Sequence, residues 1–446
     1  MQETHINRNK KAVFGWSMYD WANSVYALAI TTAIFPTYFS AVSKSPEVMV
    51  RMDNNMSIVN FLGFQVPSVS LYSYAISFAY LLIAILSPIL GSIADYSGSK
   101  KKFMFGFCLL GSISCSFLYM FDAQHYSLGV ILFVIAAIGY AGGNIFNDAF
   151  LPEVSAPEDY AKISAQGFMM GYIGSVIQLL ICLAMIIKFQ AFGFNNAIEP
   201  TRISFILVGI WWFGFAQFTF FNLKDIKPEH PVSNVISKGF AELAKVIESM
   251  KTNILLKSFL ISFLFYNMGI QTVIYMAALF GTEELHLAPQ QLIMTVLLIQ
   301  LIAIAGSQFF AYLSKILGNI KALMMGIVVW IVICIAAYFI QTAFQYYIIA
   351  CCVGFIMGGM QALSRATYSL YIPQTDDNAS FFSFYSITDK ISIILGLLSY
   401  GWVNQLTHNM RTSILFLIFY FVIGGFLLIV LQNKLKYLKP EKIDLA

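Results

Sequence analysis

Residues 91–102 read Gly-Ser-Ile-Ala-Asp-Tyr-Ser-Gly-Ser-Lys-Lys-Lys, and this short polar stretch separates two long apolar runs. A connection this short needs a tight turn, and glycine at Gly98 permits the positive φ that such a turn adopts. Gly91 has no side chain, so a neighbouring helix can approach closely there. Asp95 can lie against the amino-terminal end of a neighbouring helix, where a negative charge is stabilised by roughly 0.3–1 kcal/mol. The stretch therefore predicts two tightly connected helices whose connection carries a charge contact.

The apolar runs on either side belong to a chain that is apolar almost throughout. Of its 446 residues, 59% are hydrophobic and only 11% are charged. Soluble domains have roughly 45–50% apolar and about 25% charged residues. This composition argues against a water-soluble enzyme, a disordered regulator and a nucleic-acid-binding protein. The net charge of +4 is also too small to indicate a polyanionic partner.

Twelve apolar runs are long enough to cross a membrane as helices, since a span needs about 20 residues. They cover residues 16–42, 69–94, 103–121, 127–150, 167–189, 202–222, 258–281, 290–314, 321–340, 346–370, 384–407 and 412–432. The long polar interruption near the middle predicts four parts: an amino-terminal six-helix bundle (1–222), a linker (223–257), a carboxy-terminal six-helix bundle (258–432) and a tail (433–446). The fold class is therefore all-α and integral to the membrane.

The loop cations predict the orientation, because Lys and Arg are retained on the cytoplasmic side during insertion. Most of them fall in the amino-terminal head, the linker, the tail and the loops on the same side of the membrane. The opposite side has only Lys44, Arg51, Lys188, Arg202 and Arg411. Both termini are thus expected in the cytoplasm, in a multi-pass protein of the inner (cytoplasmic) membrane without a removable signal peptide.

The linker contains a second pattern. Apolar residues from Val232 to Met250 recur at helical spacing, opposite Lys238, Lys245 and Lys251. This predicts an amphipathic helix on the inner membrane surface. A simple tether between the two bundles is an equally good interpretation. The external loop 43–68 gives no chemical signal.

Ionisable residues inside spans are candidates for function, because each costs roughly 2.5–3.5 kcal/mol at mid-helix. The sequence has five such residues: Asp20, Asp148, Arg365, Asp389 and Lys390. Asp148 and Arg365 occupy corresponding depths in the fourth and tenth spans, so we expect them to pair as a gate. Asp20 is expected to be an unpaired carboxylate that takes up a proton or a cation. Asp389 and Lys390 are adjacent and are expected to have different partners.

Polar uncharged residues gather on the first, fourth, seventh and tenth spans. The candidate cavity residues are Asp20, Asn23, Tyr26, Asn144, Asn147, Asn267, Gln271, Gln361 and Ser364. The conformational candidates are Gly91, Asp95, Gly98, Lys101, Asp148, Arg365 and Asp389. For each amide the alternative is hydrogen bonding between helices, which is worth about 0.6–2 kcal/mol. The two halves also show a weak internal repeat. Gly142-Gly143 and Gly358-Gly359 each precede a proline and an acidic pair at the end of an even-numbered span.

The cysteines and histidines indicate no metal site, catalytic residues or cofactor. All six cysteines lie in apolar runs without a CxxC pair, as is typical of free thiols used in packing. The histidines lie outside the apolar runs. An integral-membrane transferase would need a catalytic His-Asp pair or clustered acids near a headgroup surface, and this alternative is therefore disfavoured.

Several segments resemble known families. The pattern of 91–102 is similar to the loop signature of the major facilitator superfamily, where it controls conformation. Residues 16–27 (Trp-Ser-Met-Tyr-Asp-Trp-Ala-Asn-Ser-Val-Tyr-Ala) resemble the opening of its vacuole-effluxer-like, autophagy-related permeases. Further matches are 147–153, 171–174, 265–272, 358–365 and 381–385. One departure is Met268, where that family often has an acid.

The resemblance implies a secondary active transporter that works by alternating access. In this fold the first, fourth, seventh and tenth spans line a central cavity. The expected partners are a small polar or amphipathic solute, such as an exported amino acid, the lipid bilayer and protons as coupling ion, with no nucleic acid. We expect a monomer. The rival interpretation on the same fold is a receptor or scaffold without transport activity, and solute flux in vesicles separates the two.

Overall fold

The computed structural model describes residues 10–53, 56–225, 234–407 and 409–437. Twelve helices in this part of the chain are long and apolar enough to cross a membrane, as the sequence predicted. The spans are Lys10–Ser43, Ser68–Ser97, Lys100–Met120, Tyr126–Val154, Pro157–Ile187, Ile198–Asn222, Ile254–Leu285, Gln291–Leu317, Asn319–Phe339, Ala343–Tyr371, Asn378–Thr407 and Met410–Lys436.

The first half of the chain forms the first six spans. Its elements are α1 (Lys10–Val25), η1 (Tyr26–Ala33), α2 (Phe35–Ser43), α3 (Ser68–Ser97), α4 (Lys100–Phe117), η2 (Leu118–Met120), α5 (Tyr126–Ala149), α6 (Leu151–Val154), η3 (Pro157–Asp159), α7 (Tyr160–Ile187), η4 (Phe189–Phe192) and α8 (Ile198–Asn222). The remaining elements are α9 (Val235–Thr252), α10 (Ile254–Leu285), α11 (Pro289–Leu317), α12 (Asn319–Phe339), α13 (Ala343–Tyr371), α14 (Asn378–Thr407) and α15 (Met410–Tyr437).

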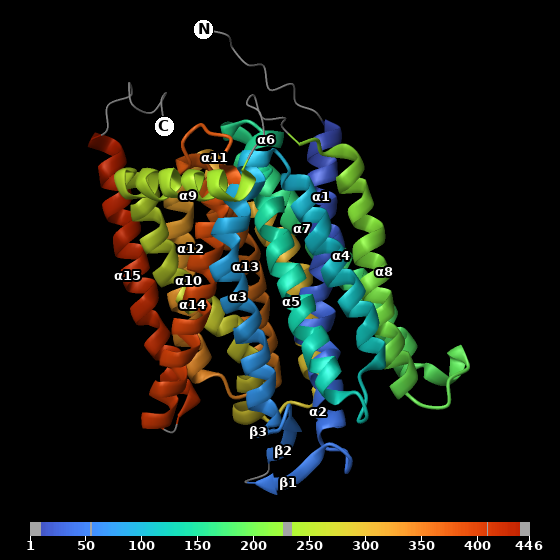
Figure 1. The fold of residues 1–446 in the computed structure, drawn as a ribbon. Helices are drawn as coiled ribbons and strands as arrows, with labels where there is room; N and C mark the ends of the chain where they lie inside the picture. Colours follow the sequence, from blue (N-terminus) through green and yellow to red (C-terminus); the bar gives the residue numbers. More distant parts are fainter. Residues whose placement is uncertain (1–9, 54–55, 226–233, 408, 438–446) are drawn as a thin grey trace.

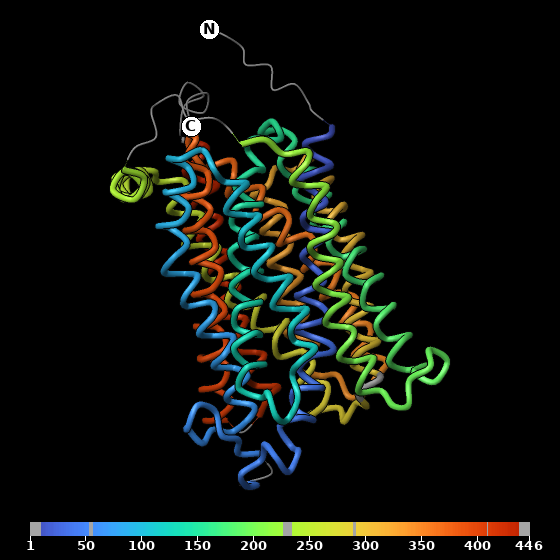
Figure 2. The backbone as a smooth tube through the Cα atoms, turned by 45° about the vertical axis from the view of Figure 1, so that its right-hand side comes forward, coloured from blue at the N-terminus to red at the C-terminus, as the bar shows by residue number. Residues whose placement is uncertain are grey.

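The long helices run side by side, and two other elements mark the ends of the bundle (Figure 1). Helix α9 lies across one end, where α1 begins and α15 ends, and Figure 2 views it down its own axis. A small sheet lies at the opposite end. We call these the α9 end and the sheet end.

We call the first six spans the first group of helices, the last six spans the second group, and the boundary where the two meet the seam. Within the first group α4 packs on α5 and α1 on α7 and α8, and within the second α11 packs on α13 and α10 on α15. Across the seam α3 packs on α14, and α7 packs on α11 and α13. Side chains on these five helices can therefore join or separate the groups.

The first span departs from a regular helix. Residues Tyr26–Ala33 form a π-helix, and Pro36 then stands in the first turn of α2. Proline lacks a backbone N–H and cannot continue the preceding helix, which accounts for a new start there. The span also begins at Lys10 instead of 16, because hydropathy alone does not detect its polar first turns.

The loop after the first span forms a sheet that the sequence analysis did not predict. Strands β1 (Met49–Asp53), β2 (Met56–Phe61) and β3 (Phe64–Pro67) pair antiparallel in that order. The β2–β3 turn has positive φ at Leu62 and Gly63, which is the geometry of a two-residue hairpin turn. Strands of four to six residues with mixed polarity give little periodic signal.

The helix predicted in the linker is present, and its position on the membrane surface stays a prediction. Helix α9 covers Val235–Thr252 and packs on α3, with Gly239 against Ile93. Ile236 and Phe240 remain exposed. Val232, the first residue of the predicted pattern, lies outside the described residues, as do the amino-terminal head to residue 9 and the tail from residue 438.

Candidate functional site

Arg365 on α13 lies at the centre of a buried charge cluster that joins the two groups of helices. Its Nη1 lies 2.8 Å from Asp148 Oδ1 on α5. Both Nη1 and Nη2 lie 3.3 Å from Asp20 Oδ2 on α1. On α7, Ser164 accepts two further bonds of 2.9 Å, from Nε to its Oγ and from Nη2 to its carbonyl oxygen. We call Arg365, Asp20, Asp148 and Ser164 the Arg365 cluster.

The predicted contact between Asp148 and Arg365 is therefore present. The prediction that Asp20 is unpaired is wrong, because it contacts Arg365 and also accepts a hydrogen bond of 3.3 Å from Asn147 Nδ2. Sequence spacing placed Asp20 on a polar face but could not show that a residue 345 positions away reaches it.

Aromatic rings cover the guanidinium. Arg365 Cζ lies 4.7 Å from the Trp16 ring centroid and 4.3 Å from that of Phe168. The Trp16 indole N–H donates to the Asn147 carbonyl oxygen at 2.7 Å. Gly167 leaves room for this layer, since a Cβ there would lie 2.9 Å from Arg365 Nη2. The rings exclude water and add a favourable cation–π interaction.

Burial makes the cluster sensitive to the loss of any member. The side chain of Arg365 is 4% exposed, and that of Asp20 is 11% exposed. Removal of one member of such a pair leaves a charge without compensation, at a cost of roughly 3–5 kcal/mol. The cluster is thus a strong link across the seam while its members stay together.

Asp95 on α3 forms a second link across the seam, at the start of α14. Its Oδ2 accepts hydrogen bonds from the Ser380 backbone N–H (2.8 Å) and hydroxyl (2.7 Å), and its Oδ1 accepts one from Ala379 N (3.2 Å). This is the contact with a helix amino terminus that the sequence predicted. The 384 boundary predicted for the eleventh span was late, because these polar residues belong to the first turn of α14.

The two glycines of this region adopt the expected geometry. A Cβ on Gly91 would lie 2.9 Å from the Ala379 carbonyl oxygen, so α3 and α14 can touch only because the residue is glycine. Gly98 has φ 58° in the turn between α3 and α4.

Outside the spans, burial raises the pKa of the Asp377 carboxyl just before α14, while a hydrogen bond from the Thr375 hydroxyl opposes that shift.

Of the three consecutive lysines, the structure brings Lys100 to this link. Its Nζ donates to the Asp376 carbonyl oxygen at 2.9 Å, lies 3.4 Å from Asp95 and contacts Glu153. The predicted Lys101 instead donates to the carbonyl oxygens of Phe220 and Leu223, and so stays within the first group of helices. Sequence spacing does not single out Lys100 among three adjacent lysines, and it does not show that Glu153 lies beside it.

Asp389 on α14 is the centre of a third polar cluster. Its Oδ1 accepts hydrogen bonds from Asn267 Nδ2 (2.9 Å) and Gln271 Nε2 (3.1 Å), both on α10. Its Oδ2 accepts one from Lys390 Nζ at 2.8 Å. The expectation of different partners holds only in part: Asp389 also binds Asn267 and Gln271, and Lys390 also contacts Tyr80, but the two residues pair because the lysine side chain turns back to its neighbour.

The remaining candidates form pairs between helices. Asn23 donates to Asn144, Tyr172 on α7 donates to Gln361 on α13 (2.9 Å), and Tyr266 contacts Ser364 (2.7 Å). Tyr26 is 1% exposed and packs on the rings of Tyr140 and Trp212. The pairs are the interhelical hydrogen bonds of the alternative interpretation, but Tyr172–Gln361 also crosses the seam.

Some mid-span side chains nevertheless keep access to solvent. Asp148 is 19% exposed, Asp389 is 21% exposed and Lys390 is 14% exposed, although each lies among several packed helices. These three side chains are therefore less buried than Arg365 and Asp20.

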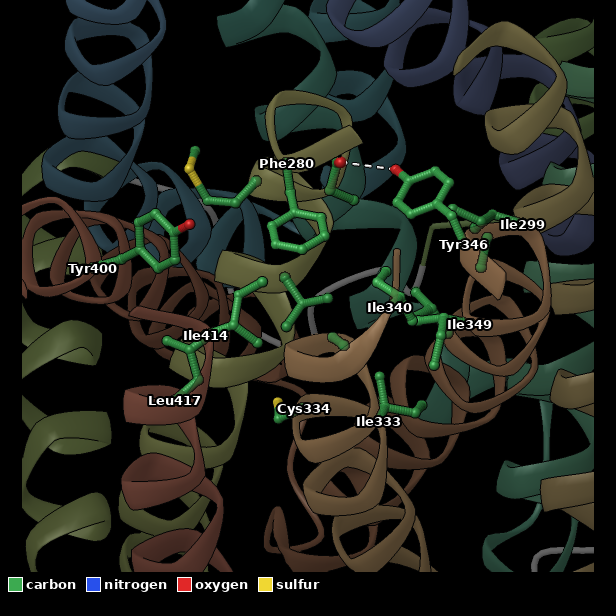
Figure 3. Close-up of a pocket in the computed structure, with 16 residues that line it drawn as sticks. Phe280, Ile299, Ile333, Cys334, Ile340, Tyr346, Ile349, Tyr400, Ile414 and Leu417 are labelled. Carbon is green, nitrogen blue, oxygen red and sulfur yellow. Dashed lines mark hydrogen bonds between the residues drawn. The ribbon is translucent and has the colours of Figure 1, made fainter. Parts of the chain in front are cut away.

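A separate apolar pocket lies inside the second group of helices (Figure 3). Its lining includes Phe280, Ile333, Tyr346, Tyr400 and Leu417, and none of the predicted cavity residues. The Tyr346 hydroxyl donates to the Ala277 carbonyl oxygen at 2.7 Å. Among the described residues no group of three His, Cys, Asp or Glu side chains is placed to hold a metal ion.

The family model described as "Vacuole effluxer Atg22 like" matches residues 8–161 and 155–436. An "Uncharacterized MFS-type transporter YxiO" of Bacillus subtilis is 31% identical over 423 residues, which cover 94% of each chain. "Autophagy-related protein 22" of Pichia angusta is 24% identical over 504 residues, covering 93% of this chain and 90% of the relative.

Solved structures share the fold at low identity. The major facilitator transporter FucP in the outward conformation has a TM-score of 0.65 at 12% identity, over 94% of this chain and 99% of its own. The human organic anion transporter MFSD10 has a TM-score of 0.68 at 11% identity, over 96% and 100% of the two chains. At such identity these likenesses establish the fold alone.

Proposed function

The chain belongs to the vacuole effluxer Atg22-like family of major facilitator transporters, and we propose that it exports a small polar or amphipathic solute, such as an amino acid, by alternating access. In this mechanism the two groups of helices rock about a mid-membrane site, so that each end of the bundle opens in turn. We assign these two groups to the predicted bundles 1–222 and 258–432.

The observation that carries the proposal is the Arg365 cluster. One guanidinium of the second group holds two carboxylates and a serine of the first group. Buried charges inside a membrane are costly and usually serve a function. A link that is strong when assembled, and whose charges can be rehydrated when it separates, is suited to a gate at the α9 end.

Charge balance supports coupling to a cation. The Arg365 cluster and the Asp389–Lys390 pair together contain three carboxylates and two basic groups. One carboxylate is thus in excess if all are ionised, and a single proton or cation would offset it. We assign this role to Asp20, because its contacts with Arg365 are longer (3.3 Å) than that of Asp148 (2.8 Å), so a proton on Asp20 leaves the Asp148–Arg365 pair in place.

The distribution of loop cations supports an α9 end that faces the cytoplasm across the inner membrane. In that orientation the Arg365 cluster and the Asp95 contact close the cytoplasmic side. Export is supported by the family description, and the amino-acid substrate by the resemblance of the motifs.

Solute flux in proteoliposomes tests the proposal. Purified protein is reconstituted and screened for counterflow of amino acids and small peptides, with and without a pH gradient. Counterflow of at least one solute, absent from vesicles with Arg365→Ala protein, is the expected result. Absence of flux for every solute with folded protein would favour the receptor or scaffold interpretation instead.

A further inference from the structure

Lys390 has no role in the gate, yet it is a cation in the middle of a membrane span. Its side chain contacts the Tyr80 ring on α3, with Nζ 4.6 Å from the ring centroid. The outer face of α14 is marked by Ile391, Leu395 and Leu398, all of which are exposed. Lys390 therefore reaches across the seam toward the first group of helices.

Its hydrogen-bonding capacity is largely unused. An ammonium group has three donors, and among the described residues Nζ of Lys390 donates one hydrogen bond, to Asp389. The side chain is 14% exposed, so it is not sealed from a ligand by the surrounding helices.

The other charged groups of these two clusters already use their hydrogen-bonding atoms. All the nitrogens of Arg365 bond to Asp20, Asp148 or Ser164. Asp389 accepts from three donors and so holds Lys390 in place. Lys390 is thus the charged group with spare capacity for a ligand.

An aromatic ring covers one side of the ammonium group. This ring belongs to Tyr80, and the side chains of Tyr140 and Tyr275 lie in the neighbourhood of Lys390. Tyr140 on α5 packs against Tyr26 of the first span, the span that also carries Asp20. The surroundings suit a ligand with an apolar or aromatic body.

We propose that Lys390 binds the carboxylate of the transported solute while Tyr80, Tyr140 and Tyr275 contact its apolar or aromatic body. This inference rests on the proposed transport function and adds the residue that recognises the solute's negative charge. Asp389 is a positioning residue in this site, because it acts through Lys390.

Binding to the full-length protein in detergent tests the inference without any need for transport. The probes are 3-phenylpropionate and 3-phenylpropionamide, which have nearly the same shape but differ in charge. The acid is expected to bind and to raise the melting temperature, and the uncharged amide is not. A hydrogen bond to a charged group is worth about 1.5–3 kcal/mol, so Lys390→Gln is expected to weaken binding of the acid by roughly tenfold or more.

Further variants separate recognition from folding. Lys390→Arg retains the charge and should retain binding. The double variant Asp389→Asn with Lys390→Gln removes the pair without leaving a buried charge, and should fold but not bind the acid. Lys188→Gln, at the exposed end of α7, is the matched control and should bind as the wild type does.

Three results would overturn the inference: no binding of the acid by wild-type protein, equal binding of the amide, or unchanged binding by folded Lys390→Gln protein. Failure of the transport proposal would appear separately, as wild-type protein that binds the acid but carries no solute in vesicles.

Discussion

The guanidinium of Arg365 lies 2.8 Å from the Asp148 carboxylate, although 217 residues separate the two in sequence. The contact joins α5 of the first group of helices to α13 of the second. In the proposed transport cycle this contact closes the α9 end of the bundle. The same guanidinium also binds Asp20 and Ser164, so its loss affects three helices of the opposite group.

Arg365→Ala should strongly destabilise the closed structure, because it leaves Asp20 and Asp148 buried without a cation. We expect a loss of roughly 3–5 kcal/mol, seen as a lower melting temperature in detergent. Arg51→Ala, on an exposed strand, is the control and should melt as the wild type does. Equal melting temperatures for the two variants would show that the cluster contributes little.

Exchange of the charges tests whether the pair itself matters for transport. Asp148→Arg and Arg365→Asp should each abolish counterflow, since each brings like charges together in a buried place. The double variant should recover part of the activity. Recovery is expected to be incomplete, because the exchanged residues cannot restore the bonds of Arg365 to Asp20 and Ser164. No recovery at all in folded protein would show that the Asp148–Arg365 pair does not act as a gate.

These contacts show how far the sequence could predict the site. Asp148 and Arg365 could be paired because both lie at matching depths in spans that were easy to delimit. Asp20 could be identified as a buried acid but not as a third partner, since helical spacing says nothing about which faces of separate helices meet. The partners of Lys100 and Lys390 were missed for a related reason: long flexible side chains contact residues that tertiary packing brings near, which the periodicity does not encode.

Most of the fold could be predicted, because the membrane requires long apolar helices that hydropathy detects. Two parts of the fold were not predicted: the polar first turn of α14 and the short strands between α2 and α3. The first turn of α14 is polar, and its backbone N–H groups donate hydrogen bonds to the Asp95 carboxylate. The strands are too short to give a periodic signal.

Asp20→Asn should retain counterflow but lose the response of flux to a pH gradient, because an amide cannot take up the proton that the carboxylate would accept. The measurement is uptake at several imposed gradients. Glu199→Gln, on an exposed turn at the start of α8, should respond as the wild type does. A normal gradient response in Asp20→Asn protein would exclude this residue as the coupling site.

Helix α9 should lie on the membrane surface through its exposed apolar residues. Tryptophan in place of Phe240 is expected to be quenched by brominated lipids, whereas tryptophan in place of Lys238 on the polar face is not. The six native tryptophans supply a background that is subtracted with wild-type protein. Equal quenching at the two positions would favour the simple tether.

Distances between spin labels test most directly whether the Arg365 cluster closes the α9 end in an alternating-access cycle. One label pair, Lys102→Cys with Lys436→Cys, spans the seam at the α9 end, and a second, Lys188→Cys with Gln341→Cys, spans it at the sheet end, both in a chain without its native cysteines. Arg365→Ala is expected to lengthen the first distance and shorten the second. Unchanged distances at both ends in folded Arg365→Ala protein would show that the Arg365 cluster does not hold the α9 end closed.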